Sequence, residues 1–76
     1  MAIDITKTER GFAIGSFMDR YGHSCSIQKS SLASEDCIWL GQDEAGGEPA
    51  RMHLTQEMAA DLIPLLKRFV KIGELK

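Results

Sequence analysis

The fold is decided by one stretch near the N-terminus, GFAIGSFMDRYGHSCSIQK (residues 11–29). Its first half is rich in aromatic and β-branched residues, which is typical of a strand. The strand pattern stops at DRYG (residues 19–22), where an aspartate in first place and a glycine in fourth favour a type I turn closed by a left-handed glycine. The stretch therefore predicts a β-hairpin over residues 11–29, in which Phe17 pairs with Cys25.

Further strands are expected after the hairpin. CIWLG begins at residue 37 and predicts a third strand over 37–42, and ARMHL predicts a short fourth strand over 50–54. The serine-rich residues 30–36 break the strand pattern and are expected to form a loop or one helical turn. Residues 43–49 are rich in turn formers and predict a flexible loop. Together these segments predict an antiparallel sheet of three or four strands.

The C-terminal part of the chain predicts a helix over residues 55–72. Thr55 is a favourable N-cap, and Gly73 is placed to end the helix. Pro64 lies beyond the first turn and removes a backbone hydrogen bond, so we expect the helix to be kinked near it. Apolar residues recur three or four positions apart and form one stripe: Met58, Leu62, Leu65, Phe69 and Ile72. We therefore expect an α+β protein in which this helix lies across one face of the sheet.

The expected strand pairing also predicts which side chains share a face. If Lys29 pairs with Cys37, Trp39 lies beside Ile27 and over Gly15, whose missing side chain leaves room for the indole. One helix cannot cover both faces of the sheet, so the face opposite Trp39 is expected to be an interface, in a homodimer or with another protein. The interface residues expected on that face are Phe12, Ile14, Ile38 and Leu40.

Length and composition limit the possible functions. The 76 residues predict a single domain over 1–76, with residues 1–10 as a flexible arm or a short edge strand. A domain of this size buries only about 60 % of its unfolded surface, which leaves little room for a buried active site. The net charge of −2 argues against nucleic-acid binding. No segment has the pattern of a signal peptide or a membrane span, so we expect a cytoplasmic protein with no membrane partner.

Histidine and cysteine residues give no pattern typical of a metal or catalytic site. His23, Cys25, Cys37 and His53 come from three predicted strands and contain no Cys-x-x-Cys pair. Buried thiols that behave as small apolar side chains therefore explain the cysteines better than a zinc site. A Cys–His nucleophilic pair would also need an orienting acid and an oxyanion hole, and nothing in the sequence marks either. We expect no metal, no cofactor and no enzymatic activity.

Seven polar residues are candidates for binding a partner or an anion. Lys29, Ser30 and Ser31 offer an amine and hydroxyls that can hold a phosphate or a carboxylate, although the glycines of a P-loop are missing. Arg51 and His53 are two residues apart, so they share one face of the predicted fourth strand. The remaining two candidates stand at the hairpin turn, where they can rim an apolar docking surface: Arg20 and Tyr21.

Four motifs in the chain resemble a known group of proteins: DRYG (19–22), CSIQKSSLA (25–33), EDCIWLG (35–41) and RMHLT (51–55). Together with the helix that follows, they resemble a family of small uncharacterised phage and prophage proteins over residues 11–72. Members of that family often have a longer insertion before the RMHL segment, where this chain has only the short loop 43–50. The resemblance implies a phage accessory protein that acts in the cytoplasm of the bacterial host.

Three functions follow as hypotheses. The leading one is a non-enzymatic phage accessory protein that inhibits a component of host anti-phage defence by protein–protein contact, which rests on analogy with other small phage proteins. A second is the capture of a small anionic ligand, such as a nucleotide signal, near Lys29 and Arg51. A third is a small nucleic-acid-binding regulator, which the negative net charge disfavours.

Overall fold

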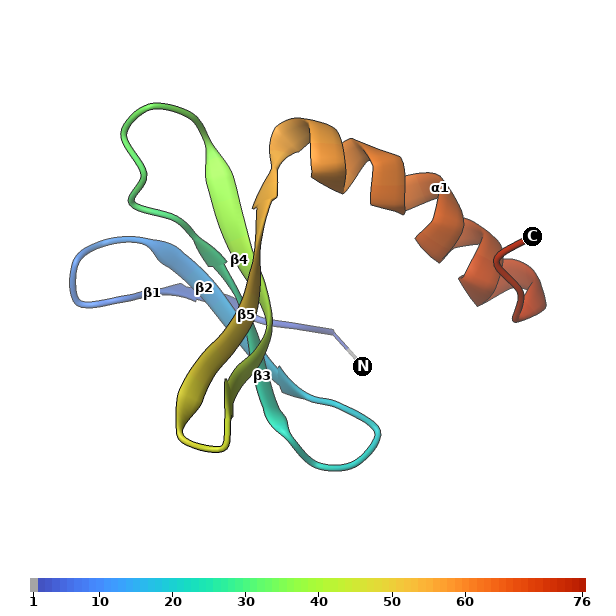
Figure 1. Ribbon diagram of the computed structural model, residues 1–76, viewed down its shortest axis with the longest axis horizontal. Coiled ribbons are helices and arrows are strands. Elements are labelled where there is room, and N and C mark those ends of the chain that lie inside the picture. Colours follow the sequence, from blue (N-terminus) through green and yellow to red (C-terminus); the bar gives the residue numbers. More distant parts are fainter. Residues whose placement is uncertain (1) are drawn as a thin grey trace.

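The computed structural model describes residues 2–76, which form a five-stranded antiparallel sheet followed by one helix (Figure 1). Each strand pairs with the next one along the chain, so the sheet is a meander with the order β1-β2-β3-β4-β5. The expected α+β fold is confirmed, with one strand more than the largest number predicted. The elements are β1 (Ile5–Lys7), β2 (Ala13–Met18), β3 (Ser24–Lys29), β4 (Cys37–Ala45), β5 (Glu48–Thr55) and α1 (Gln56–Ile72).

The additional strand is β1, in the segment expected to be an arm or an edge strand. Ile5 of β1 pairs with Gly15 of β2. A Cβ atom on Gly15 would lie 2.7 Å from Cγ2 of Ile3 and 2.8 Å from Cδ1 of Ile5, so the missing side chain makes room for β1. The expectation that Trp39 uses this room is therefore wrong. Met1, the first residue of the predicted arm, lies outside the described residues.

The hairpin of β2 and β3 has the predicted pairing. Phe17 lies opposite Cys25, and the Asp19 N–H donates to the His23 carbonyl at 3.1 Å. Gly22 closes the turn with a φ of 82°, a left-handed conformation that glycine adopts without steric cost. The local turn signal was therefore sufficient to determine this part of the sheet.

The pairing of β3 with β4 differs from the prediction by one residue. Lys29 lies opposite Ile38 rather than Cys37. The reason is that pairing continues beyond the predicted end of β3, because the Ser30 N–H donates to the Cys37 carbonyl at 3.0 Å. The helical turn considered for residues 30–36 is also wrong, since these residues form a loop without helix.

This shift moves every side chain of β4 to the other face of the sheet. Ile38 and Leu40 join Phe17, whereas Trp39 joins Ile14. The expected interface of Phe12, Ile14, Ile38 and Leu40 is therefore divided between two faces. The face that we call the apolar face carries Phe17, Cys25, Ile27, Ile38, Leu40, Met52 and Leu54. The face that we call the polar face carries Ser26, Gln28, Trp39, Arg51 and His53.

Strands β4 and β5 extend further than predicted. The segment expected to be a flexible loop continues both strands to a two-residue turn at Gly46 and Gly47. Their φ angles of 61° and 83° are those of a type I′ turn, which matches the twist of the strands on either side. The pairing shifts between Gln42 and Glu44, which leaves Asp43 in a bulge.

The helix α1 begins directly after β5. Thr55 is its N-cap and accepts a hydrogen bond from the Met58 N–H at 3.1 Å, and Gly73 ends it in a left-handed conformation. Pro64 lies inside the helix, whose axis curves without a break (Figure 1). The helix projects away from the sheet, so its expected position across one sheet face is wrong. Between residues 2 and 76 no helix has the length and the apolar character needed to span a membrane.

Candidate binding site on the polar face

A single arginine ties three strands together on the polar face. Arg51 of β5 lies opposite Gly41 of β4, which in turn lies opposite Ser26 of β3. The Arg51 side chain extends over this glycine, and its Nη1 donates to Ser26 Oγ at 3.2 Å and to Gln28 Oε1 at 2.8 Å. Gly41 has a φ of 137°, a conformation that side chains rarely adopt, and an added Cβ would lie 3.5 Å from the Arg51 Cα. The glycine of the IWLG motif therefore lies directly opposite the arginine of the RMHL motif.

The hydroxyl group of Ser26 links this arginine to an acidic residue. Ser26 is only 2 % exposed, and its Oγ donates to Asp43 Oδ1 at 2.5 Å while it accepts from Arg51. In the described part of the chain, no carboxylate lies within 4 Å of the Arg51 guanidinium. The arginine is thus held by neutral oxygens, and its positive charge has no direct ion pair.

Two aromatic rings are stacked beside Arg51. The Trp39 indole and the His53 imidazole have centroids 4.0 Å apart and planes inclined by 16°. The Arg51 Cζ lies 5.7 Å from the Trp39 ring centroid, within the range of a cation–π interaction. His53 Nε2 also forms a 2.9 Å hydrogen bond with Ser30 Oγ. These contacts make the arginine, the tryptophan and the histidine one connected surface.

A cleft of about 330 Å³ opens next to Trp39. One wall comes from the turn between β1 and β2, and the other comes from the end of β3 and the residues after it. Two of its residues are cationic: Arg10, whose Cζ lies 5.7 Å from the Phe12 ring centroid, and Lys29, whose Nζ donates to Asp36 at 2.9 Å. The residues that line the cleft are Thr8, Glu9, Arg10, Phe12, Gln28, Lys29, Ser31 and Trp39.

The structure brings together five of the seven predicted binding residues. Lys29 and Ser31 line the cleft, and the other three surround Trp39 on the polar face: Ser30, Arg51 and His53. Arg20 and Tyr21 do not join them, because they lie at the opposite end of β3, roughly 20 Å away along the strand.

Gln28, Trp39 and Arg10 belong to the site but were not predicted from the sequence as binding residues. Gln28, Trp39 and His53 form one row across three strands, and the predicted register had placed Trp39 on the wrong face. With the correct pairing of β4, the sequence would have placed these three side chains next to one another. Arg10 carried no sequence signal, because its place in the cleft depends on the pairing of β1 with β2.

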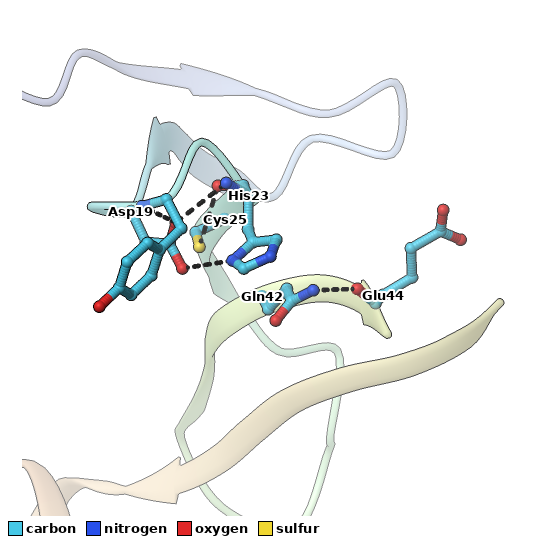
Figure 2. Close-up of polar contacts among 6 residues, drawn as sticks. Asp19, His23, Cys25, Gln42 and Glu44 are labelled. Atoms are coloured by element: carbon cyan, nitrogen blue, oxygen red, sulfur yellow. Dashed lines mark hydrogen bonds and ion pairs between the residues drawn. The ribbon is translucent and has the colours of Figure 1, made fainter. Parts of the chain in front are cut away.

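The turn between β2 and β3 is a separate, braced structure. Asp19 Oδ1 accepts hydrogen bonds from the N–H groups of Tyr21 and His23, both at 2.9 Å. Figure 2 shows the His23 ring directed at the same carboxylate, with Nδ1 2.7 Å from Oδ2. The hydrogen bond from the His23 side chain lowers the pKa of Asp19 below its ordinary value of 3.8. The braced turn holds Tyr21 84 % exposed.

The cysteines are buried thiols at different places in the sheet. Cys25 lies opposite Gln42 near the far end of β4, whereas Cys37 begins that strand, and both are free. Burial raises the pKa of both thiols. Across residues 2–76, no group of three or more histidine, cysteine or acidic residues is placed to hold a metal ion.

The site is thus a stacked aromatic pair and an arginine on the sheet, next to a cleft whose walls carry Arg10, Glu9 and the Lys29–Asp36 ion pair. Such an arrangement can hold a flat ring by stacking and a negative group by charge-assisted hydrogen bonds. Comparisons of the chain with protein-family models, with curated proteins and with solved structures found no match.

Proposed function

We propose that this chain is a non-enzymatic binding protein, and that its cleft captures a small ligand that carries a flat aromatic group and a negative charge, such as a nucleotide. The observation that carries the proposal is the meeting of Trp39 and Phe12 with Arg10 and Lys29 around one cleft of about 330 Å³. This volume lies at the lower end of the range of small-molecule sites, roughly 300–1,000 Å³.

Each part of the cleft suits one part of such a ligand. Stacking of a base on an aromatic side chain contributes about 1–3 kcal/mol, which Trp39 or Phe12 can provide. Arg10 supplies a cation for a phosphate or a carboxylate, and Lys29 supplies a second one once it exchanges its ion pair with Asp36 for the ligand. Gln28 and Ser31 add hydrogen-bonding groups that can select the orientation of the ring.

The contact between Ser30 and His53 favours binding over catalysis. A serine within 2.9 Å of a histidine has the geometry of a nucleophile and its base. However, Ser30 is only 5 % exposed, and its Oγ also accepts the Leu32 N–H at 3.2 Å. This hydroxyl is held inside the protein, where it is poorly placed to attack a substrate. Its hydrogen bond to His53 instead orients the imidazole against Trp39.

The resemblance to phage proteins gives this proposal a biological setting. A small protein that sequesters a nucleotide signal in the bacterial cytoplasm would inhibit a host defence system without contacting its protein components. The resemblance covers residues 11–72, and this segment includes five residues that line the cleft: Phe12, Gln28, Lys29, Ser31 and Trp39.

Intrinsic fluorescence tests the proposal directly, because Trp39 is the single tryptophan of the chain. Titration with AMP, ATP and cyclic dinucleotides should quench or shift its emission for at least one nucleotide below about 1 mM. Replacement of both cations (R10A with K29A) should weaken that binding by at least about tenfold, since each loses a charge-assisted contact. The control variant is K67A on the helix, which should bind as the unchanged protein does. No change in emission with any nucleotide at millimolar concentration would contradict the proposal.

Inhibition of a host protein by direct contact is the second candidate function. The observation that favours it is the braced turn, which holds Tyr21 84 % exposed next to Arg20. Tyrosine and arginine are enriched among the residues that contribute most to protein–protein binding, and a rigid turn loses little entropy on docking. Immobilised protein should then retain one host protein from bacterial lysate, and Y21A should lose it. Equal retention by the unchanged protein and Y21A would exclude the turn as the contact.

A further inference from the structure

The chain exposes more surface than a compact protein of its size. Its accessible surface is 6366 Å². A folded monomer of 8.4 kDa has about 4,600 Å². The difference, about 1,800 Å², shows that a large area normally buried in a core is uncovered in the single chain. In the described residues, the buried hydrophobic side chains are those of Cys25 and Cys37 alone.

Two apolar surfaces contribute to this excess. One is the apolar face of the sheet, where Met52 is 53 % exposed and no second layer covers the strands. The other is the stripe along α1, which has no buried residue and includes Phe69 at 55 % exposure. A groove of about 190 Å³, lined in part by Ile38, Leu54 and Ala59, joins the two surfaces.

The helix cannot cover the sheet of its own chain. β5 ends at Thr55 and α1 begins at Gln56, so no loop lies between them. The hydrogen bond from the Met58 N–H to Thr55 Oγ1 sets the direction of the first turn, and Figure 1 shows the helix leading away from the strands. A return over the same sheet would need a connection of several residues, as is usual between a strand and a helix.

We propose that a second copy of this chain covers both surfaces, with α1 of each copy packed on the apolar face of the other copy's sheet. In a dimer with a twofold axis the contact is reciprocal, so the helix and the apolar face of both copies are covered at once. Burial of the whole excess of about 1,800 Å² on each copy gives about 3,600 Å² in total, within the range of permanent homodimers, roughly 2,000–5,000 Å². The inference does not rest on ligand capture, because it is argued from the apolar face and α1, whereas Trp39 and Arg51 belong to the polar face.

The mass of the protein in solution is the first test. Sedimentation equilibrium at micromolar concentration should give twice the chain mass of 8.4 kDa. A folded species with the mass of one chain at that concentration would overturn the inference.

The arrangement of the dimer needs a second measurement. We would mix isotope-labelled and unlabelled chains and record nuclear Overhauser effects between them, so that only contacts between copies are seen. Contacts from Leu62 and Phe69 of one copy to Ile27 and Leu40 of the other are expected. Contacts between the two helices alone, or through the polar face, would overturn the proposed packing.

A pair of variants on the helix tests the energetics. F69Q should raise the dissociation constant of the dimer by about 100-fold or more, because the twofold axis makes each lost aromatic contact count twice. K71Q changes a residue on the polar side of the helix, two positions further along, and should leave the dissociation constant of the dimer unchanged. Equal dissociation constants for F69Q and the unchanged protein would also overturn the inference. If F69Q does not fold, the contacts measured in the unchanged protein decide the question.

Discussion

The side chains on the two faces of the sheet differ in where they find their contacts. The polar face is completed within one chain, because Arg51 of β5 spans Gly41 and reaches Ser26 and Gln28 of β3. The apolar face has cross-strand pairs such as Leu40 with Met52, but no second layer covers them, because the helix lies elsewhere. Polar side chains can therefore find their hydrogen-bonding and stacking partners within one sheet. Apolar side chains need a second layer that buries them from water.

The largest expected effect tests whether the apolar face is covered. L40A should lower the free energy of unfolding by about 2–5 kcal/mol if a second layer buries this leucine. Urea denaturation followed by circular dichroism measures this change. The control E44A alters an exposed side chain of the same strand and should stay within about 0.5 kcal/mol of the unchanged protein. A loss of less than about 1 kcal/mol for L40A would mean that the apolar face is open to water.

An intermediate effect is expected on the polar face. G41A places a side chain where φ is 137°, and the new Cβ would lie 3.5 Å from the Arg51 Cα. Backbone strain of this kind costs about 1–3 kcal/mol, and we expect its relief to shift β4 relative to Arg51 and Ser26. We expect lower stability together with a change in Trp39 emission, because Arg51 lies 5.7 Å from that ring. G22A is a useful comparison, since it strains a distant turn and should leave the emission unchanged. Identical emission from G41A and the unchanged protein would contradict the expectation that a change at Gly41 reaches Trp39 through Arg51.

The smallest expected effect is local and depends on pH. The pKa of Asp19 is lowered in the folded chain, so its carboxylate stabilises the turn at pH values above 3.8, the ordinary pKa. This stabilisation is lost as the pH falls through the lowered pKa. Amide exchange at Tyr21 and His23 should therefore be slow at pH 5 and become faster, relative to the rest of the sheet, under more acidic conditions. D19N should remove the pH dependence, and an unchanged profile in D19N would show that another group is responsible.

Local signals in the sequence were sufficient for the parts of the fold that they directly determine. The turn at residues 19–22 set the pairing of β2 and β3, and the cap residues Thr55 and Gly73 set the ends of α1. The loop at residues 30–36 contains no comparable turn signal, so the pairing of β3 with β4 was wrong by one residue. Such a shift reverses every side chain of a strand, which is why a small error in register became a large error in the faces.

The candidate site was predictable to the extent that its residues are adjacent in the sequence or alternate along one strand. Lys29, Ser30 and Ser31 were found because they form one polar segment. Trp39 was missed because its position depends on the register of β4, and Arg10 because the turn before β2 folds onto the end of β3. Contacts between distant segments require the topology as well as the composition, so they could not be derived from a local pattern.

The tight turn at Gly46 and Gly47 has a practical consequence. It lies at the opposite end of β4 from Trp39, and the turn glycines have no heavy atom near the position of an added Cβ. An affinity tag or a fluorescent label spliced in at this tip would thus stand clear of the cleft and of the junction between strand and helix. The hairpin offers a handle by which the protein can be anchored to a sensor surface without occupying the parts whose binding is to be measured.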